Sequence, residues 1–235
     1  MATLETPTKL RELQRALYQR AKKEPNFRAY ALYDKVYRED VLAHAYALAK
    51  ANGGAPGPDG VTFKDIEARG REELLEELRD ELKTKGYRPG AVRRVNIPKA
   101  GGGQRPLGIP SIRDRVVQGA AKLVLEPLFE ADFDEDSYGF RRKRNAHQAL
   151  EALWRQTMAM HGGWVLEIDI RKFFDTLDHS HLRSILGQRV RDGVILRLIG
   201  KWLNAGVMEC GCVTHPETGS PQGGVISPAL ANVYL

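Results

Sequence analysis

The apolar positions in the first third of the chain recur at helical spacing. They predict three amphipathic helices, over residues 8–24, 41–51 and 72–85. Thr8 is placed to cap the first helix and Pro25 to end it. Glycines and prolines crowd the segment between the second and third helices, which predicts a loop there. This part of the chain is therefore expected to be helical.

The spacing then changes from that of helices to that of strands. Residues 92–97 and 105–109 flank a run of glycines, which predicts a β-hairpin. Residues 164–170 predict a further strand that is buried on at least one face. The remaining predicted elements are helices over 111–129, 146–160, 180–190 and 193–205, a short β region over 207–214, and a helix that starts at Ser227.

A carboxylate, Asp169, stands near the end of the predicted strand 164–170. Side chains alternate along a strand, so Glu167 and Asp169 share one face. Together with the backbone carbonyl of Ile170, Asp169 offers the oxygen ligands that Mg²⁺ prefers. Phosphoryl transfer with two metal ions needs at least one further carboxylate, and Asp175 is better suited to local capping. An ordinary aspartate at a strand end remains the alternative.

Two aromatic residues, Phe173 and Phe174, follow this carboxylate in the sequence. Either ring can pack in a core, and Phe174 is the better candidate for that role. A ring at Phe173 that is held against a ribose would instead reject a 2′-hydroxyl by steric contact. The residues alone leave both interpretations open.

Cations and a glycine-rich turn flank this region. Arg93, Lys99 and Arg105 lie on or beside the predicted hairpin, where they form either a solvated basic face or a site that neutralises a triphosphate. Gln222 and Gly223 lie in a Pro-Gln-Gly-Gly turn. The glycine permits close backbone approach, and the amide can bond a base or sugar edge. Such turns are common, so this signal is weak by itself.

The charge of the chain favours a partner that carries phosphates. The 235 residues have a formal net charge of +6, and Lys and Arg gain affinity for nucleic acid by releasing counterions. A soluble basic protein without such a partner is the alternative. Cys210 and Cys212, even with His215 nearby, are too few for a disulfide framework or a usual structural zinc site. No membrane span or secretion signal is visible, so we expect a cytoplasmic protein.

Five segments follow one another in a distinctive order, namely 57–62 (GPDGVT), 93–110 (RRVNIPKAGGGQRPLGIP), 137–147 (SYGFRRKRNAH), 169–175 (DIRKFFD) and 220–228 (SPQGGVISP). In this order and spacing they resemble the motifs of bacterial group II intron reverse transcriptases. The first segment is similar to the loop that these enzymes carry before the fingers. The resemblance covers about residues 8–235 and is highly specific. Arg142 departs from it, since many family members have proline at that position.

The resemblance implies a site for metal and nucleotide. Asp169 would be the first catalytic metal ligand, helped by the carbonyl of Ile170, in an enzyme that uses two Mg²⁺ ions. Phe173 would be the steric gate against ribonucleotides. The incoming deoxynucleoside triphosphate would also contact Lys99, Arg105, Gln222 and Gly223, and nucleic acid would contact Arg93, Arg94, Arg141 and Arg144.

The resemblance also implies an α+β right-hand polymerase fold, with helix-rich fingers that carry a β-hairpin and an incomplete antiparallel palm sheet. We expect an N-terminal helical extension and the start of the fingers over residues 1–90, fingers over 91–160 and a partial palm over 161–235. The Tyr-x-Asp-Asp hairpin, which carries the other two metal ligands of the family, would lie downstream of Leu235. We therefore expect a fragment with little polymerase activity of its own.

The implied function is RNA-directed DNA polymerisation by the protein of a mobile intron. Its partners would be an intron RNA that it helps to splice, an RNA template, a DNA or RNA primer and deoxynucleoside triphosphates. Two alternatives remain open: a non-catalytic RNA-binding module or degenerate element, and a reverse transcriptase of retron, diversity-generating or defence type. Phe173 disfavours a viral-type RNA polymerase. An exposed sheet edge would also favour self-association as a homodimer.

Overall fold

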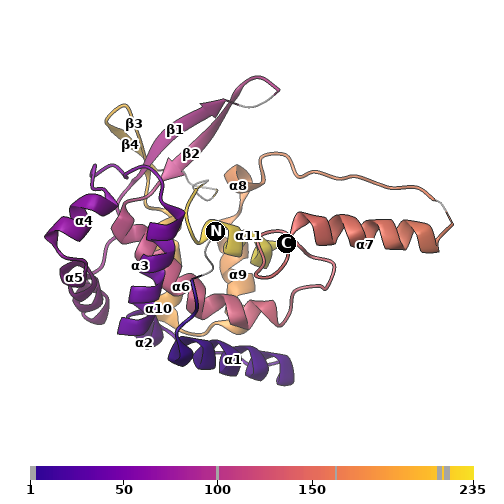
Figure 1. The fold of residues 1–235 in the computed structure, drawn as a ribbon, viewed down its shortest axis with the longest axis horizontal. Coiled ribbons are helices and arrows are strands. Elements are labelled where there is room, and N and C mark those ends of the chain that lie inside the picture. The colour runs from indigo at the N-terminus through magenta and orange to yellow at the C-terminus, as the bar shows by residue number, and fades with distance from the viewer. Residues whose placement is uncertain (1–3, 99–100, 162, 216–218, 220–222) are drawn as a thin grey trace.

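The computed structural model describes residues 4–98, 101–161, 163–215, 219 and 223–235. A helical body carries a small sheet on one side, and one helix with its following segment projects away from that body (Figure 1). Among the described residues, no helix is both long and apolar enough to cross a membrane.

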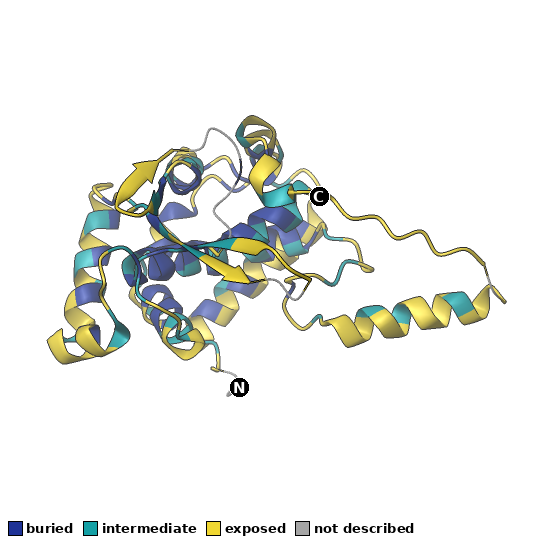
Figure 2. Cartoon of the chain, turned by 90° about the horizontal axis from the view of Figure 1, so that it is seen from above, coloured by how far each residue is buried: buried dark blue, intermediate teal, exposed yellow. Residues whose placement is uncertain are grey.

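Helix α6 (Ile112–Glu130) forms the centre of the body. Ser111 caps this helix by accepting a hydrogen bond from the backbone N–H of Asp114. Most residues of this helix are buried, so other elements surround it. The buried residues gather inside the body, whereas the projecting helix and the segment after it are mostly exposed (Figure 2). The elements that contact it from the N-terminal part are α1 (Thr8–Lys23), α2 (Tyr33–Val36), α3 (Glu39–Asn52) and α5 (Arg71–Lys83), and α4 (Phe63–Arg69) packs on α5.

Four short strands form one sheet in the order β2-β1-β3-β4. β1 (Val92–Pro98) and β2 (Gln104–Ile109) pair antiparallel, as the predicted hairpin. β3 (Val207–Glu209) pairs parallel with β1 and antiparallel with β4 (Cys212–Thr214). The sheet therefore joins the hairpin to a segment from the far end of the sequence.

Three further helices complete the body, namely α9 (His179–Arg189), α10 (Gly193–Leu203) and α11 (Ser227–Tyr234). α9 packs on α10 and on α11, and α11 also packs on α6. Asp192 caps α10 and accepts hydrogen bonds from the backbone N–H groups of Leu32 and Tyr33, both at 2.8 Å. This buried carboxylate links the two halves of the chain.

Helix α7 (Ala146–Ala159) and the segment after it form the projection in Figure 1. Asn145 and Gln148 form a capping box at the start of α7, although no residue of the helix is buried. Residues 163–170 are exposed throughout and form no strand. The prediction of a partly buried strand over 164–170 is therefore wrong for this structure, because no other described segment pairs with it.

Other elements differ from the predictions by less. Thr8 is the first residue of α1 rather than its cap, and no side chain caps that helix. The short helices α2 and α4 were not predicted, although a capping box of Thr62 and Asp65 marks the start of α4. The sheet is mixed rather than antiparallel, because β3 runs parallel to β1. The α+β class and the hairpin are confirmed.

Candidate active site

Asp169, the candidate metal ligand, lies in the projecting segment 163–170 and is exposed. Its carboxylate and the neighbouring carbonyl of Ile170 are hard oxygen donors, which suit Mg²⁺. Within the described part of the chain, no three His, Cys, Asp or Glu side chains gather closely enough to hold a metal ion. The donor chemistry fits magnesium, but Asp169 supplies one carboxylate to a kind of site that needs more.

Phe173, the candidate gate, begins the short helix α8 (Phe173–Thr176) directly after the projecting segment. Lys172 precedes it with a φ of 54°, in the left-handed region, so the chain turns sharply here. The Phe173 ring packs edge-to-face against Phe174 and Tyr234, with centroid distances of 5.4 and 5.8 Å. Phe173, rather than Phe174 as expected, packs against the buried core.

Two glycines bring three distant segments together. Gly219 has a φ of +88°, and a Cβ there would lie 2.7 Å from the carbonyl oxygen of Phe174 in α8. Gly223 has a φ of +108°, and a Cβ there would collide with the carbonyl oxygen of Gly108 in β2. Only glycine fits such backbone contacts at positive φ. Gly219 therefore lies against α8, which carries the predicted gate, and Gly223 lies against β2, which carries Arg105 of the predicted triphosphate site.

The arginines at the start of β1 have partners within the chain. Arg93 is half-buried and donates a hydrogen bond to the carbonyl oxygen of Pro56 at 2.8 Å, while its buried Nε has no hydrogen-bond partner among the described residues. Arg94 is exposed and forms an ion pair with Glu209 at 3.3 Å. Arg93 therefore holds the loop before α4 against the hairpin, and Arg94 connects β1 to β3.

The other candidate nucleotide contacts are only partly described. Arg105 is exposed on β2, opposite Ile97 of β1. Gly223 is exposed beside β2. Lys99 and Gln222 lie outside the described residues. The structure thus brings Arg105 and Gly223 to the same strand, and their contacts with a nucleotide stay a prediction.

Arg141 and Arg144 shape the loop between α6 and α7. Arg141 is buried, pairs with Glu130 at 2.8 Å, and donates to the carbonyl oxygen of Ser137 at 2.7 Å. The Arg144 guanidinium lies over the Tyr138 ring, 5.2 Å from its centroid. Both arginines therefore have contacts within the folded chain. Their contact with nucleic acid stays a prediction.

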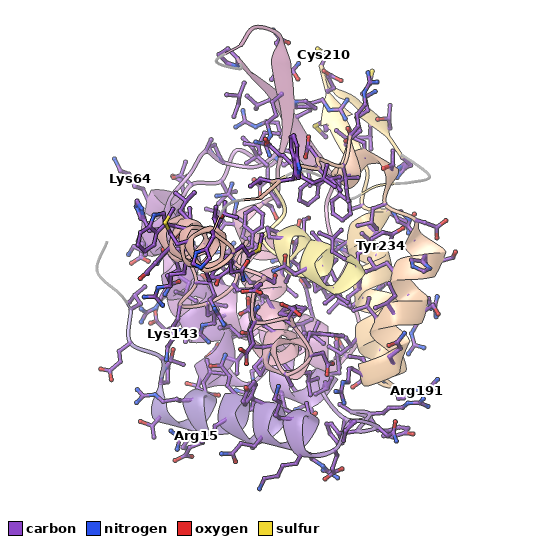
Figure 3. The ribbon with its side chains drawn as sticks, turned by 90° about the vertical axis from the view of Figure 1, so that its right-hand side faces the viewer. Arg15, Lys64, Lys143, Arg191, Cys210 and Tyr234 are labelled. Atoms are coloured by element: carbon purple, nitrogen blue, oxygen red, sulfur yellow. The ribbon has the colours of Figure 1, made fainter. Side chains whose placement is uncertain are left out.

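Cys210 and Cys212 are free, exposed thiols on the β3–β4 hairpin. Cys210 lies at the opposite end of the molecule from Arg15 of α1 (Figure 3). The nearby His215 places its Nδ1 3.2 Å from the carbonyl oxygen of Asn204. The cysteines are therefore remote from the helical core of the molecule.

Arg115 was missed in the sequence analysis, although it organises the loop that follows α3. Its guanidinium donates to the carbonyl oxygens of Pro110 at 3.0 Å, Gly53 at 3.3 Å and Ala55. Burial lowers the pKa of Arg115, and the nearby Arg93 lowers it further, against an opposing effect of a carboxylate. The sequence signal for this role was the position of Arg115 among the apolar residues of the predicted helix 111–129.

The fold and these converging motifs define a class of protein. A family model described as reverse transcriptase (RNA-dependent DNA polymerase) matches residues 97–235, and the chain belongs to this family. A solved structure titled "Partial Cas6-RT-Cas1--Cas2 complex" aligns with a TM-score of 0.55 and 23% identity, over 87% of this chain and 34% of that chain. At this identity the likeness shows a shared fold alone.

Relatives with higher identity include proteins named for introns. The chain is 40% identical to Protein YkfC of Escherichia coli (strain K12), over 95% of this chain and 60% of that protein. It is 37% identical to the group II intron-encoded protein LtrA of Lactococcus lactis subsp. cremoris, over 87% of this chain and 34% of LtrA. It is also 34% identical to the putative COX1/OXI3 intron 1 protein of Saccharomyces cerevisiae, over 83% of this chain and 23% of that protein. The resemblance to the group II intron type is confirmed, and the chain spans only part of these relatives.

Proposed function

We propose that this chain forms the fingers and part of the palm of a group II intron-type RNA-directed DNA polymerase. In that role it binds an RNA template and a DNA or RNA primer, and it places a deoxynucleoside triphosphate beside Asp169. The supporting observation is that Gly219 lies against α8 and Gly223 lies against β2. Segments that resemble separate motifs of the family are neighbours in space, although they are far apart in sequence.

Each group has a physical task in this reaction. Magnesium, which Asp169 and the carbonyl of Ile170 would hold, neutralises charge on the triphosphate when bound. Lys99 and Arg105 place positive charge where the pyrophosphate leaves. The Phe173 ring is held by its packing partners, so it can exclude a 2′-hydroxyl by contact. Gly223 keeps its segment close against β2, the strand that carries Arg105.

A non-catalytic role in RNA binding is the second candidate. It is favoured by the surroundings of Asp169, which joins no cluster of metal-binding side chains among the described residues and lies on an exposed segment. An incomplete ligand set in a two-metal site is expected to lower the rate by about 10³-fold or more. The basic hairpin would still bind the phosphates of RNA.

Primer extension tests whether this chain is itself catalytic, and RNA binding tests both candidates. The chain, its Asp169→Asn variant and a control Asp80→Asn variant on the exposed face of α5 are given an RNA template, primer, deoxynucleoside triphosphates and Mg²⁺, and RNA binding is measured in parallel. We expect all three to bind RNA and none to extend the primer appreciably. Extension that only Asp169→Asn abolishes would establish catalysis by this chain. Extension that survives this substitution would refute the role of Asp169, and failure to bind RNA would refute both candidates.

A further inference from the structure

A pocket of about 490 Å³ lies between α3, α6 and β2, and the proposed catalytic role does not use most of it. Its volume is in the range of pockets that bind small ligands. One wall comes from the successive turns of α3 that carry His44, Leu48 and Asn52. Leu107 of β2 and Gly223 also line the pocket. The pocket therefore adjoins the segments that are proposed to hold the nucleotide.

His44 is a buried histidine in the lining of this pocket. The residue is only 6% exposed, and no hydrogen bond joins its ring to any other described residue. Burial, and then the charge of Arg142, lowers the pKa of His44. At neutral pH the imidazole is therefore uncharged, with one donor and one acceptor available to a ligand.

The charged side chains around the pocket favour an anion. Three cations, Arg115, Lys122 and Arg142, line it together with one carboxylate, Glu126. Lys122 lies 3.7 Å from Glu126, and the carboxyl is mostly buried, which raises its pKa. Arg142 donates to uncharged oxygens, at 3.0 Å to the Gln14 amide and 3.4 Å to a threonine hydroxyl. The lining thus has an excess of two positive charges, three cations against one carboxylate.

The remaining walls are apolar and suit a flat ring. Leu48, Leu107, Ile109 and Val225 all contribute to the lining. A nucleotide combines the two properties that this lining selects, because its base has apolar faces with polar edges and its phosphate is an anion. A phosphate alone would leave the apolar walls unfilled, and an apolar ligand would leave the His44 nitrogens without a partner.

We propose that the pocket between α3, α6 and β2 binds one unpaired nucleotide of an RNA strand, with the base against His44 and Leu48 and the phosphate beside Arg142 and Lys122. The proposal rests on the proposed function, which supplies RNA as the ligand. A strand is favoured over a free nucleotide because the lining includes Leu107 of β2 and Gly223, from segments that the proposed function assigns to the reaction on an RNA strand.

The test uses single-stranded RNA that carries one 2-aminopurine, whose fluorescence reports the surroundings of an unpaired base, and anisotropy of the same RNA reports affinity. His44→Ala removes the base partner, and Ala49→Trp fills the pocket from α3. Arg15→Ala is the control, because Arg15 is exposed on α1 outside the pocket. Circular dichroism and urea unfolding verify that each variant is folded, and free adenosine monophosphate is a separate ligand arm.

We expect His44→Ala and Ala49→Trp each to weaken RNA binding by about tenfold and to abolish the fluorescence change, while Arg15→Ala stays within about twofold. His44 is uncharged, so its loss should leave the salt dependence unchanged. Arg142→Gln should reduce the slope of log affinity against log salt by about 0.7.

Either pocket variant binding RNA like the parent chain, with the same fluorescence change, would overturn the pocket proposal and leave RNA binding intact. Saturation by adenosine monophosphate at micromolar concentration would overturn the choice of a strand. No RNA binding by the parent chain would overturn the proposed function as well, so the two failures are distinguishable.

Discussion

Asp192→Ala is expected to be among the most destabilising single substitutions in this chain. The carboxylate is 7% exposed and accepts four backbone hydrogen bonds. Two come from Val194 and Ile195 in the first turn of α10, and two come from Leu32 and Tyr33 at the start of α2. Alanine removes all four acceptors at once, so both helices lose a partner.

The size of the effect follows from these bonds. Replacing an aspartate cap by alanine costs about 1 kcal/mol. The two N–H groups of the N-terminal segment are in buried residues, and each buried donor without a partner costs about 1–3 kcal/mol. We therefore expect the free energy of unfolding to fall by about 3–7 kcal/mol. Asp192→Asn keeps one acceptor oxygen and should lose less.

Urea unfolding followed by circular dichroism measures this loss. The matched control is Asp178→Ala, because Asp178 caps α9 but is exposed and has no bond to the N-terminal segment. Its substitution should lower stability clearly less than Asp192→Ala. Equal losses in the two variants would refute the argument that Asp192 joins the halves of the chain.

The same carboxylate gives a dependence on pH. Burial alone would raise the pKa of Asp192, but the backbone N–H donors outweigh burial and hold the pKa below its usual value. A lowered pKa means that the ionised form stabilises the folded state above the unfolded pKa, about 3.9. This stabilisation is lost as the pH falls through the folded pKa. The stability difference between the parent chain and Asp192→Asn should therefore shrink from pH 6 toward pH 3, and a constant difference would contradict the assignment.

Three further predictions concern the core, the glycine-rich turn and the projection. Tyr87→Phe removes a buried hydroxyl that donates to Asp114, and should lower the free energy of unfolding by about 1–3 kcal/mol in the urea assay; no loss would contradict a structural role for this bond. Gly223→Ala should lower the free energy of unfolding more than Gly211→Ala does. Both glycines have positive φ, but a Cβ at Gly211 would meet no atom within 4 Å among the described residues. Equal losses would contradict the close approach of Gly223 to β2. Leu166 is 82% exposed, so the parent chain should self-associate in sedimentation velocity. The Leu166→Glu variant should self-associate less. A parent chain that stays monomeric at all concentrations would refute this role of Leu166.

The elements that could be predicted are those whose hydrogen bonds are local. Helix α7 is the clearest example, since it forms with a capping box at Asn145 although none of its residues is buried. The cap of α6 at Ser111 was likewise visible in the sequence. Residues 164–170 have strand-forming side chains, but the bonds of a strand must come from another strand. Periodicity therefore indicates that these residues favour a strand, but it does not show whether a second strand is available to pair with them.

The sequence indicated which segments form the candidate site, but not which of their residues contact one another. The sequence shows glycines in the turn, but not that Gly219 lies against α8 and Gly223 against β2. It also shows arginines as cations without their partners. Arg141 is buried against Glu130, and Arg93 bonds the carbonyl of Pro56, so each has a structural task that spacing does not reveal. His44 gave no signal because a single histidine in a helix is ordinary.

The projecting segment connects the folding of this protein to its chemistry. Catalytic groups must be held within about 0.5 Å of their working geometry, yet Asp169 lies on exposed chain that no described strand restrains. Fixing the backbone of each residue there costs about 1–2 kcal/mol in conformational entropy. Pairing of residues 164–170 with another strand would offset that loss through hydrogen bonds and through burial of Leu166 and Ile168, which are now exposed. Because the sharp turn at Lys172 lies only a few residues after Asp169, such pairing would fix the carboxylate relative to α8. Such pairing would therefore also position Asp169 for its proposed role as a metal ligand.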